Sequence, residues 1–311
     1  MNVSDLLKID FPARKEIVAG LVPSGCLILA GAPKVGKSWF VLQLASAVAT
    51  GVPFMGAETT KGRVLYLALE DGFTRLQSRI KTQQAGNDGF DLGMLYVQIE
   101  IQKANRGGLK EIEDWLVENP DAALVILDVL KMYRSERSAK TNPYDQDYTD
   151  IRPLTALANK YKVGIVIVHH TNKGNAQAVD PFDRVSGTGG ISGAADGTLI
   201  LAPDEAGNIG LYGRGRDFQE FDKFIRLNPD FCVWEESEPI ESYSATAGDL
   251  QNAILRQLKR AEGPMGAKAM SELIDYDSKS ISNALGKLTS KGKIKRAKYG
   301  NYVLPEFADL Q

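Results

Sequence analysis

The sequence predicts an α/β protein with a mainly parallel sheet, helices on both faces, an antiparallel extension and a small helical C-terminal domain. Between residues 25 and 168, short apolar runs of strand length alternate with helical segments, which is typical of a parallel sheet with helical crossovers. After residue 193 the strands follow one another closely, which predicts hairpins added to that sheet. From residue 249 onwards, helices and a basic hairpin replace this pattern.

After a lead-in over residues 1–24, the chain forms an apolar strand at residues 26–30, a Gly-rich turn and a helix at residues 37–50. The turn reads GAPKVGKS and fits the pattern G-x-x-x-x-G-K-[ST], which binds nucleotide phosphates between a strand and a helix. Its glycines let the backbone N–H groups curve around a polyphosphate, and the positive end of the helix points at the same anion. The alternative is a Gly-rich turn without a ligand.

In the nucleotide-binding interpretation, Lys37 reaches the β- and γ-phosphates and the Ser38 hydroxyl ligates Mg²⁺. We therefore predict a nucleoside triphosphate and Mg²⁺ as cofactors. The residues predicted to hold the nucleotide at this turn are Gly31, Ala32, Pro33, Lys34, Val35, Gly36, Lys37, Ser38 and Trp39.

The other elements of this part are predicted from their apolar periodicity and from the Gly, Pro and Asn residues that bound them. Strands are expected at residues 63–69, 95–98, 122–127 and 163–168. Helices are expected at residues 73–84, 109–118 and 144–161, with a kink or boundary at Pro153. The hairpin strands, which follow a Gly-rich loop at residues 187–193, are expected at residues 198–202, 209–212, 223–227 and 231–234.

Ionisable residues follow several of the buried strands, and the carboxyl ends of parallel strands share one edge of a sheet. Asp128 ends one strand and would orient the Mg²⁺ shell, unless it only makes a turn. Glu70 is our candidate general base, with Asp71 as its rival and a solvated acidic turn as the alternative. Of the two histidines, His170 is preferred over His169 as a hydrogen-bonding partner of the γ-phosphate, the alternative being one packed and one solvated histidine.

Two arginines of a late strand, Arg214 and Arg216, are candidates for stabilising transition-state charge from a neighbouring subunit, with Arg216 first. A basic edge strand is the alternative. Residues 131–147 and 171–191 are predicted as long loops near the nucleotide, with basic residues that could contact a nucleic-acid backbone. Solvated loops without such a role are the alternative to this interpretation.

Composition restricts the class of protein. Hydrophobic residues make up 43% and charged residues 24% of 311 residues, as in soluble globular proteins. No apolar run approaches the length of a membrane span, and the charged N-terminus lacks the apolar stretch of a signal peptide. Cys26 and Cys232 both lie in apolar runs, which predicts buried thiols in a reducing compartment. We therefore expect a cytoplasmic protein without a membrane partner.

Charge and rhythm change at the C-terminal end. The predicted organisation is a core at residues 1–240, a linker at 241–248 and a second domain at 249–311, which carries 11 Lys and Arg against 7 Asp and Glu. The order of its elements is that of a winged helix-turn-helix domain. Its expected partner is duplex DNA or a protein, although a solvated basic face would show the same charge. Its helices are expected at residues 250–260, 267–274 and 278–290, and its hairpin at residues 293–298 and 302–304.

The motifs GAPKVGKS, YLALED, LVILD, VIVHHTNK and YGRGRD, in this order and spacing, resemble the RecA-like ATPases of the hexameric replicative helicase group. Among these, the double histidine at a strand end is similar to the RepA-type plasmid and phage helicases. The resemblance implies a RecA-like core that hydrolyses ATP with Mg²⁺ in a homo-oligomer, which is a hexamer in that group. The implied roles are phosphate and Mg²⁺ binding by Lys37 and Ser38, catalytic base for Glu70, metal binding by Asp128, γ-phosphate sensing by His170, and a basic pair formed by Arg214 with the finger Arg216 acting in trans.

The first functional hypothesis is a ring-forming, ATP-driven helicase of a plasmid, phage or mobile element, with single-stranded DNA gripped by loops 131–147 and 171–191. The alternative is an ATP-switched DNA-binding or regulatory ATPase that does not unwind DNA. The basic C-terminal domain has no counterpart in the smallest members of the helicase family, and it is the feature that keeps the alternative open.

Overall fold

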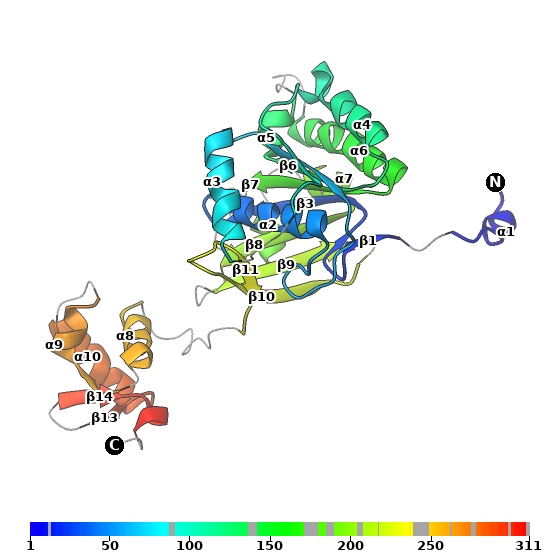
Figure 1. The fold of residues 1–311 in the computed structure, drawn as a ribbon. Coiled ribbons are helices and arrows are strands. Elements are labelled where there is room, and N and C mark those ends of the chain that lie inside the picture. Colours follow the sequence, from blue (N-terminus) through cyan, green and yellow to red (C-terminus); the bar gives the residue numbers. More distant parts are fainter. Residues whose placement is uncertain are drawn as a thin grey trace. The chain divides into compact units, whose positions relative to one another are not determined.

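A nine-stranded mixed sheet forms the centre of the larger part of the molecule, with strand order β11-β10-β9-β8-β3-β7-β6-β4-β5 (Figure 1). A computed structural model describes residues 1–11, 14–86, 91–135, 142–170, 180–184, 190–203, 208–216, 218–238, 249–261, 263–274, 278–297 and 300–308. The chain divides into two compact units, Met1–Pro239 and Ile240–Gln311. The predicted linker at residues 241–248 lies outside the described residues.

The sheet combines a parallel part with an antiparallel extension, as predicted. Strands β8, β3, β7, β6, β4 and β5 run parallel to their neighbours, whereas β9, β10 and β11 are added as antiparallel strands. The bounds of the strands are β3 Gly25–Gly31, β4 Arg63–Ala68, β5 Leu95–Gln98, β6 Ala122–Asp128, β7 Gly164–His170, β8 Gly197–Pro203, β9 Ile209–Gly215, β10 Phe221–Leu227 and β11 Trp234–Glu236.

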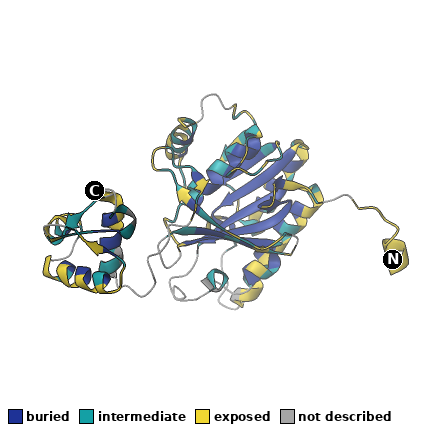
Figure 2. Ribbon diagram, turned by 90° about the horizontal axis from the view of Figure 1, so that it is seen from below, coloured by how far each residue is buried: buried dark blue, intermediate teal, exposed yellow. Residues whose placement is uncertain are grey.

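Helices cover both faces of this sheet (Figure 1). Helices α2 (Lys37–Thr50) and α3 (Phe73–Gln84) pack on one face, and α4 (Gly108–Glu118), α6 (Pro143–Tyr161) and α7 (Gly190–Ala194) pack on the other. The central strands are buried on both faces, which Figure 2 shows as a dark blue layer between the helices. This explains their continuous apolar sequences, because a strand covered on both sides has no solvent face.

Several predicted elements differ from the structure. The last hairpin strand is β11 (Trp234–Glu236) rather than the predicted residues 231–234, because residues 231–233 lie at a turn in which the Cys232 N–H donates to the Asn228 carbonyl. Pro153 lies inside α6 and ends no helix. The lead-in contains a small hairpin, β1 (Glu16–Val18) with β2 (Val22–Pro23), after the short helix α1 (Val3–Leu6).

The predicted long loops contain helical segments. Helix α5 (Leu130–Tyr133) follows β6, and α6 begins at residue 143, so both ends of the 131–147 segment are helical. In the Gly-rich segment at residues 187–193, α7 begins at residue 190. Residues 136–141, 171–179 and 185–189 lie outside the described part of the chain. The remaining short turns are the 3₁₀ helices η1 (Ala104–Arg106) and η3 (Pro181–Arg184).

The second unit packs three helices against a three-stranded sheet of order β12-β14-β13. Its apolar core includes Ile254, Leu258, Ile281, Leu285 and Leu304. The second helix is shorter than predicted, and a strand that the sequence did not predict, β12, precedes it. The elements are α8 Asp249–Ala261, β12 Met265–Gly266, α9 Ala267–Ser271, α10 Ser278–Ser290, β13 Lys295–Arg296, β14 Asn301–Val303 and η5 Pro305–Phe307.

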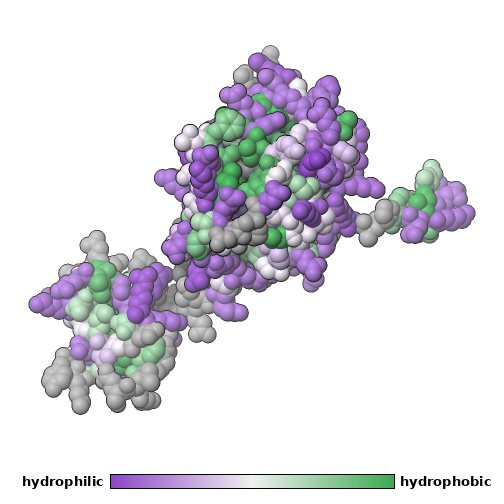
Figure 3. Space-filling model, viewed as in Figure 1, coloured by the Kyte–Doolittle hydropathy of each residue, from purple (hydrophilic) through white to green (hydrophobic). Residues whose placement is uncertain are grey.

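Large hydrophobic side chains are exposed along the first residues of the chain, and Figure 3 shows them in green among hydrophilic surface. None of the residues of α1 is buried. No helix in the described ranges is both long and apolar enough to cross a membrane. The exposed hydrophobic residues of this N-terminal segment are Met1, Val3, Leu6, Leu7, Ile9 and Phe11.

The two cysteines differ in exposure, which corrects the prediction that both are buried. Cys26 lies inside β3 and is fully buried, and burial raises the pKa of its thiol to about 12. Cys232 is only half-buried, at the turn before β11.

We expect a disulfide thiol reagent at pH 8 to modify Cys232 and not Cys26 in the native protein, because only a thiolate that the reagent can reach reacts. Spectrophotometric titration should therefore give one reactive thiol per chain, and two after unfolding in guanidinium chloride. Cys232→Ser should abolish the native reaction. A native reaction that persists in this variant would show that β3 opens to solvent.

Candidate nucleotide site

The phosphate loop lies where β3 ends and α2 begins, and both glycines of its pattern are required by space. A Cβ atom on Gly31 would lie 2.7 Å from the backbone oxygen of Leu201. Gly36 has a φ of +103°, and a Cβ atom there would lie 2.6 Å from the ring of Trp234. The turn can therefore curve closely only because these positions lack side chains.

Lys37 is held inside this turn and is 5% exposed. Its ammonium group donates hydrogen bonds to the backbone oxygens of Gly31 and Ala32, both at 2.8 Å. Burial lowers the pKa of Lys37 to about 8, while the nearby carboxylates of Asp128 and Glu70 oppose that shift. A phosphate placed in the turn would supply the negative charge that the buried ammonium lacks.

The strand register brings the other predicted residues to the same edge. His170 pairs with Gly31 across β7 and β3, and Asp128 pairs with Ala68 across β6 and β4. Glu70 follows β4 by two residues. The charges act on one another: Lys37 and Glu70 both shift the pKa of His170, and Glu70 raises that of Asp128. Lys37, Glu70, Asp128 and His170 therefore form one electrostatic cluster.

Asp128 is 4% exposed, and burial is the main cause of its raised pKa. The Tyr66 hydroxyl donates to its Oδ2 at 3.0 Å, and this bond and one from Ser38 oppose the rise in pKa. The Oδ1 atom, by contrast, makes no hydrogen bond of normal length with the described residues. A buried carboxylate oxygen that lacks hydrogen-bond donors and lies beside a hydroxyl oxygen can act as a ligand. Such a pair of oxygen ligands suits Mg²⁺. These residues therefore fit the predicted metal.

Glu70 and Asp71 have different environments, although they are neighbours. The side chain of Asp71 is 7% exposed and forms ion pairs with Arg75, at 2.5 Å, and with Arg79, both of α3. Glu70 is exposed, and its carboxylate acts on Lys37 and His170. Asp71 is thus engaged in fixing α3, whereas the charge of Glu70 acts on Lys37 of the phosphate loop.

His170 is half-buried at the end of β7. Burial, followed by the positive charge of Lys37, holds the pKa of its imidazole below the ordinary value. The ring is therefore neutral at pH 7, with one nitrogen that donates and one that accepts a hydrogen bond.

Arg214 and Arg216 lie away from the phosphate loop of their own chain. Gly215 pairs with Gly197, and Gly197 pairs with Leu27 of β3. Leu27 lies about 13 Å along β3 from Gly31, the first residue of the phosphate loop. Arg216 donates to the Gly193 carbonyl at 2.8 Å. A single chain therefore does not bring the two arginines to its own nucleotide site.

Arg214 is engaged by neighbours within its own chain. Its guanidinium group forms ion pairs with Asp180 at 3.1 Å and Glu220 at 2.7 Å, and it lies 4.1 Å from the ring centroid of Phe182. The hydrogen bonds to Glu220 and Asp180 raise its pKa. To contact another group, Arg214 would have to exchange these partners.

One basic residue of the predicted nucleic-acid loops has a structural role. Arg134 is largely buried and pairs with Asp147 at 2.9 Å and with Asp150 at 3.7 Å, both in α6. It is therefore not available to a nucleic-acid backbone, which corrects the expectation for this residue. Lys131 is exposed on α5. The basic residues outside the described part of these loops are Arg137, Lys140 and Lys173.

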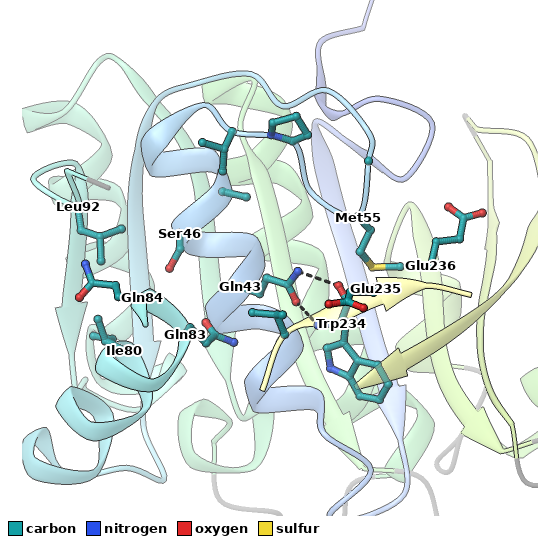
Figure 4. Close-up of a pocket in the computed structure, with 15 residues that line it drawn as sticks. Gln43, Ser46, Met55, Ile80, Gln83, Gln84, Leu92, Trp234, Glu235 and Glu236 are labelled. Carbon is teal, nitrogen blue, oxygen red and sulfur yellow. Dashed lines mark hydrogen bonds between the residues drawn. The ribbon is translucent and has the colours of Figure 1, made fainter. Parts of the chain in front are cut away.

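Trp234 is a residue of the site that sequence reasoning missed. Its indole N–H donates to the Gly36 carbonyl at 3.3 Å, and its backbone exchanges two hydrogen bonds with the Gln43 side chain, at 2.9 and 2.6 Å (Figure 4). The indole thus supports the phosphate loop from the end of the antiparallel extension. Trp234 and Gly36 are 198 residues apart, so no local pattern could have indicated the contact.

A family model described as an AAA domain matches residues 2–176. The chain is similar to an ATPase domain of known structure, with 15% identity, a TM-score of 0.56, and coverage of 69% of this chain and 85% of that chain. A DnaB-like replicative helicase, whose structure was described with its interactions with primase, gives 15% identity, a TM-score of 0.58, and coverage of 76% and 67%.

A KaiC-like protein from the hyperthermophilic archaeon Pyrococcus horikoshii OT3 gives 13% identity and a TM-score of 0.51, and covers 73% of this chain and 99% of that chain. No curated protein matches the sequence. At these identities, the TM-scores show a shared fold and no more than that.

We expect Tyr66→Phe to lower the free energy of unfolding by about 1–3 kcal/mol, because it removes a hydrogen bond to a buried carboxylate. Urea unfolding followed by circular dichroism measures the change. Tyr96→Phe is the matched control, since Tyr96 is 41% exposed and should leave stability within about 0.5 kcal/mol. Equal midpoints for the two variants would mean that Tyr66 does not hold Asp128.

Proposed function

The chain belongs to the AAA domain family and is a P-loop ATPase with a RecA-like core, and we propose that it is a ring-forming helicase that acts on single-stranded DNA. The observation that carries this proposal is that the predicted site residues lie at two separate places in one chain. One group of predicted residues clusters at the phosphate loop and consists of Lys37, Glu70, Asp128 and His170. The other group, Arg214 and Arg216, lies at the opposite end of the parallel strands.

The cluster supports a direct role in hydrolysis. Lys37 and the backbone N–H groups of the loop bind the phosphates. Ser38 and Asp128 would hold Mg²⁺, which would neutralise negative charge on the phosphates. Glu70 accepts a proton from the attacking water, whose oxygen bonds to the γ-phosphorus as the bond to ADP breaks. The neutral His170 hydrogen-bonds the γ-phosphate and loses that bond on release, which gives β7 a signal of the nucleotide state.

The proposed assembly follows from the position of the arginines. An arginine that cannot reach its own nucleotide can complete the site of a neighbouring chain, where it stabilises charge in the transition state. The N-terminal segment supports self-association, because six large hydrophobic side chains are exposed within its first eleven residues. A closed ring, with six subunits as in the helicase group that the motifs resemble, places every arginine at a nucleotide.

The similarity to a DnaB-like replicative helicase supports the choice of DNA as the polymer that the ring moves along. In this proposal the segments that follow β6 and β7 contact single-stranded DNA, since both begin at the nucleotide edge of the sheet. Loss of the γ-phosphate then shifts these segments and moves the strand.

The second unit supports a further contact. We propose that it is a winged helix domain, because its helices and strands follow one another in the order α8, β12, α9, α10, β13, β14. The exposed face of α10 carries Lys287, Lys291 follows this helix, and the exposed β13 adds Lys295 and Arg296. Among the described residues between 278 and 297, none is acidic, which suits a duplex DNA backbone. A protein with an acidic surface is the other partner of this kind.

The second candidate function is an ATP-switched DNA-binding or regulatory protein. The observation that favours it is this basic second unit, because a duplex-binding domain needs no strand separation. The similarity to a KaiC-like protein shows that the same core fold also occurs in a protein that is not named as a helicase.

We expect Lys37→Ala to abolish hydrolysis and unwinding, and Arg216→Ala to abolish hydrolysis while ATP still binds. When the two inactive variants are co-assembled, activity should return to part of the wild-type rate. An intact phosphate loop of the Arg216→Ala chain then meets an intact Arg216 of the Lys37→Ala chain. Steady-state ATPase rates and binding of a fluorescent ATP analogue measure these effects.

Activity that stays absent in mixed assemblies would contradict a role in trans, and wild-type turnover by Arg216→Ala alone would remove the finger assignment. Mixing Lys37→Ala with Glu70→Gln is the control, because these two residues serve the same nucleotide and no interface regains both of them.

Strand separation distinguishes the two candidate functions. The helicase proposal predicts that single-stranded DNA stimulates hydrolysis and that forked DNA is unwound in a fluorescence assay. The switch proposal predicts duplex binding without unwinding.

In either case, if this face of the second unit binds duplex DNA, the charge reversals Lys287→Glu and Lys291→Glu should weaken duplex binding. Each phosphate interaction that they remove should reduce the salt slope of the affinity by about 1.

Lys61→Glu is the matched control, since Lys61 is exposed in the first unit. Unchanged duplex affinity in the Lys287 and Lys291 variants would assign that face to another partner.

A further inference from the structure

We propose that a pocket beside the phosphate-loop helix binds an apolar ligand that carries an N–H donor, an amine or an amide, and that this ligand tightens ATP binding. The pocket has a volume of ≈ 660 Å³ and is lined by α2, the turn after it, α3, Leu92 and residues 233–236 (Figure 4). Its size lies in the range of pockets that hold small molecules. The phosphate loop itself is not part of its lining.

Gln83 provides the polar anchor of this site. Its side chain lies between α3 and α2 in Figure 4, and the residue is 6% exposed. The amide nitrogen donates to the backbone oxygens of Trp39 at 3.1 Å and Cys232 at 3.0 Å. Its carbonyl oxygen, Oε1, makes no hydrogen bond with the described residues, although the atom is buried. Buried acceptors are normally paired, and because this oxygen has no open surface, an N–H group of a ligand would pair with it after a shift of the Gln83 side chain.

The walls determine the chemistry of that ligand. Val52, Met55, Ile80 and Leu92 give the pocket an apolar surface. Its described lining contains two glutamates and no Lys, Arg or His. These two carboxylates, of Glu235 and Glu236, are bonded to Asn228 and Lys223, which lie outside the lining. An anionic ligand would therefore bring negative charge to a wall without a cation, whereas an amine or amide satisfies the acceptor.

Trp234 connects the pocket to the nucleotide site. Trp234 is a lining residue whose indole contacts Gly36, and its backbone is fixed by Gln43, which lines the same pocket. Gln83 adds a second connection through the backbone of Trp39. A ligand that fills the pocket supports Trp234 from behind and holds the phosphate loop in its curved form. This coupling requires only ATP binding, so it does not depend on helicase activity.

Three probes with one apolar body test the proposal by calorimetry on the full-length protein: 2-naphthylethylamine, 2-naphthylacetamide and 2-naphthylacetate. We expect the amine and the amide to bind at least tenfold more tightly than the acetate. With the amine at saturation, the Kd for ATP should fall at least threefold. Ser46→Leu, which adds volume to the lining, should weaken the amine at least tenfold and remove the effect on ATP.

Gln83→Met should weaken the amide at least tenfold, because it removes the acceptor at similar size. Gln77→Met, an exposed position of the same helix, is the matched control and should bind all probes as the wild type does. The ATP affinity of Ser46→Leu without a probe shows that this variant is folded. Equal binding of the three probes, no saturable binding, amine binding that survives Ser46→Leu, or an unchanged Kd for ATP would each overturn the proposal.

Discussion

The parallel register of four neighbouring strands is the constraint on which the nucleotide site depends. Strands β4, β6, β7 and β3 run in one direction and pair residue by residue, so their carboxyl ends share one edge. Glu70, Asp128, His170 and Lys37 reach that edge from distant parts of the sequence. Because side chains alternate between the faces of a sheet, a slip of one residue would turn the functional side chain of that strand away from the others.

Much of the nucleotide site at this edge could be predicted, because the sequence patterns that indicate it are local. The phosphate-loop pattern, the apolar strands and the ionisable residues at their ends each occupy a few consecutive positions, and α2 and α3 have the predicted bounds. What could not be predicted depends on contacts between distant segments. Trp234 and Tyr66 read as ordinary core residues until folding brings them to Gly36 and Asp128. Arg134 reads as available for DNA because its partners lie beyond a loop.

The position of Arg216 changes what one chain can accomplish. The cluster at the phosphate loop has groups for binding phosphate, holding Mg²⁺ and accepting a proton, but the guanidinium group assigned to the transition state lies at the far end of the strands. If Arg216 acts in trans as proposed, each chain carries two different halves of a site. In the proposed assembly this arrangement couples hydrolysis to association of the subunits, since ATP bound to an isolated chain lacks the guanidinium charge of Arg216 at the moment of cleavage.

The ion pairs of Asp71 have a consequence for the orientation of α3. Asp71 holds Arg75 and Arg79, and Leu76 anchors the same helix to the sheet, so the turn carrying Glu70 and the first turns of α3 form one rigid body. The far half of that helix supplies a wall of the ≈ 660 Å³ pocket. A tilt of this single helix therefore changes the width of the pocket and the position of the Glu70 carboxylate together.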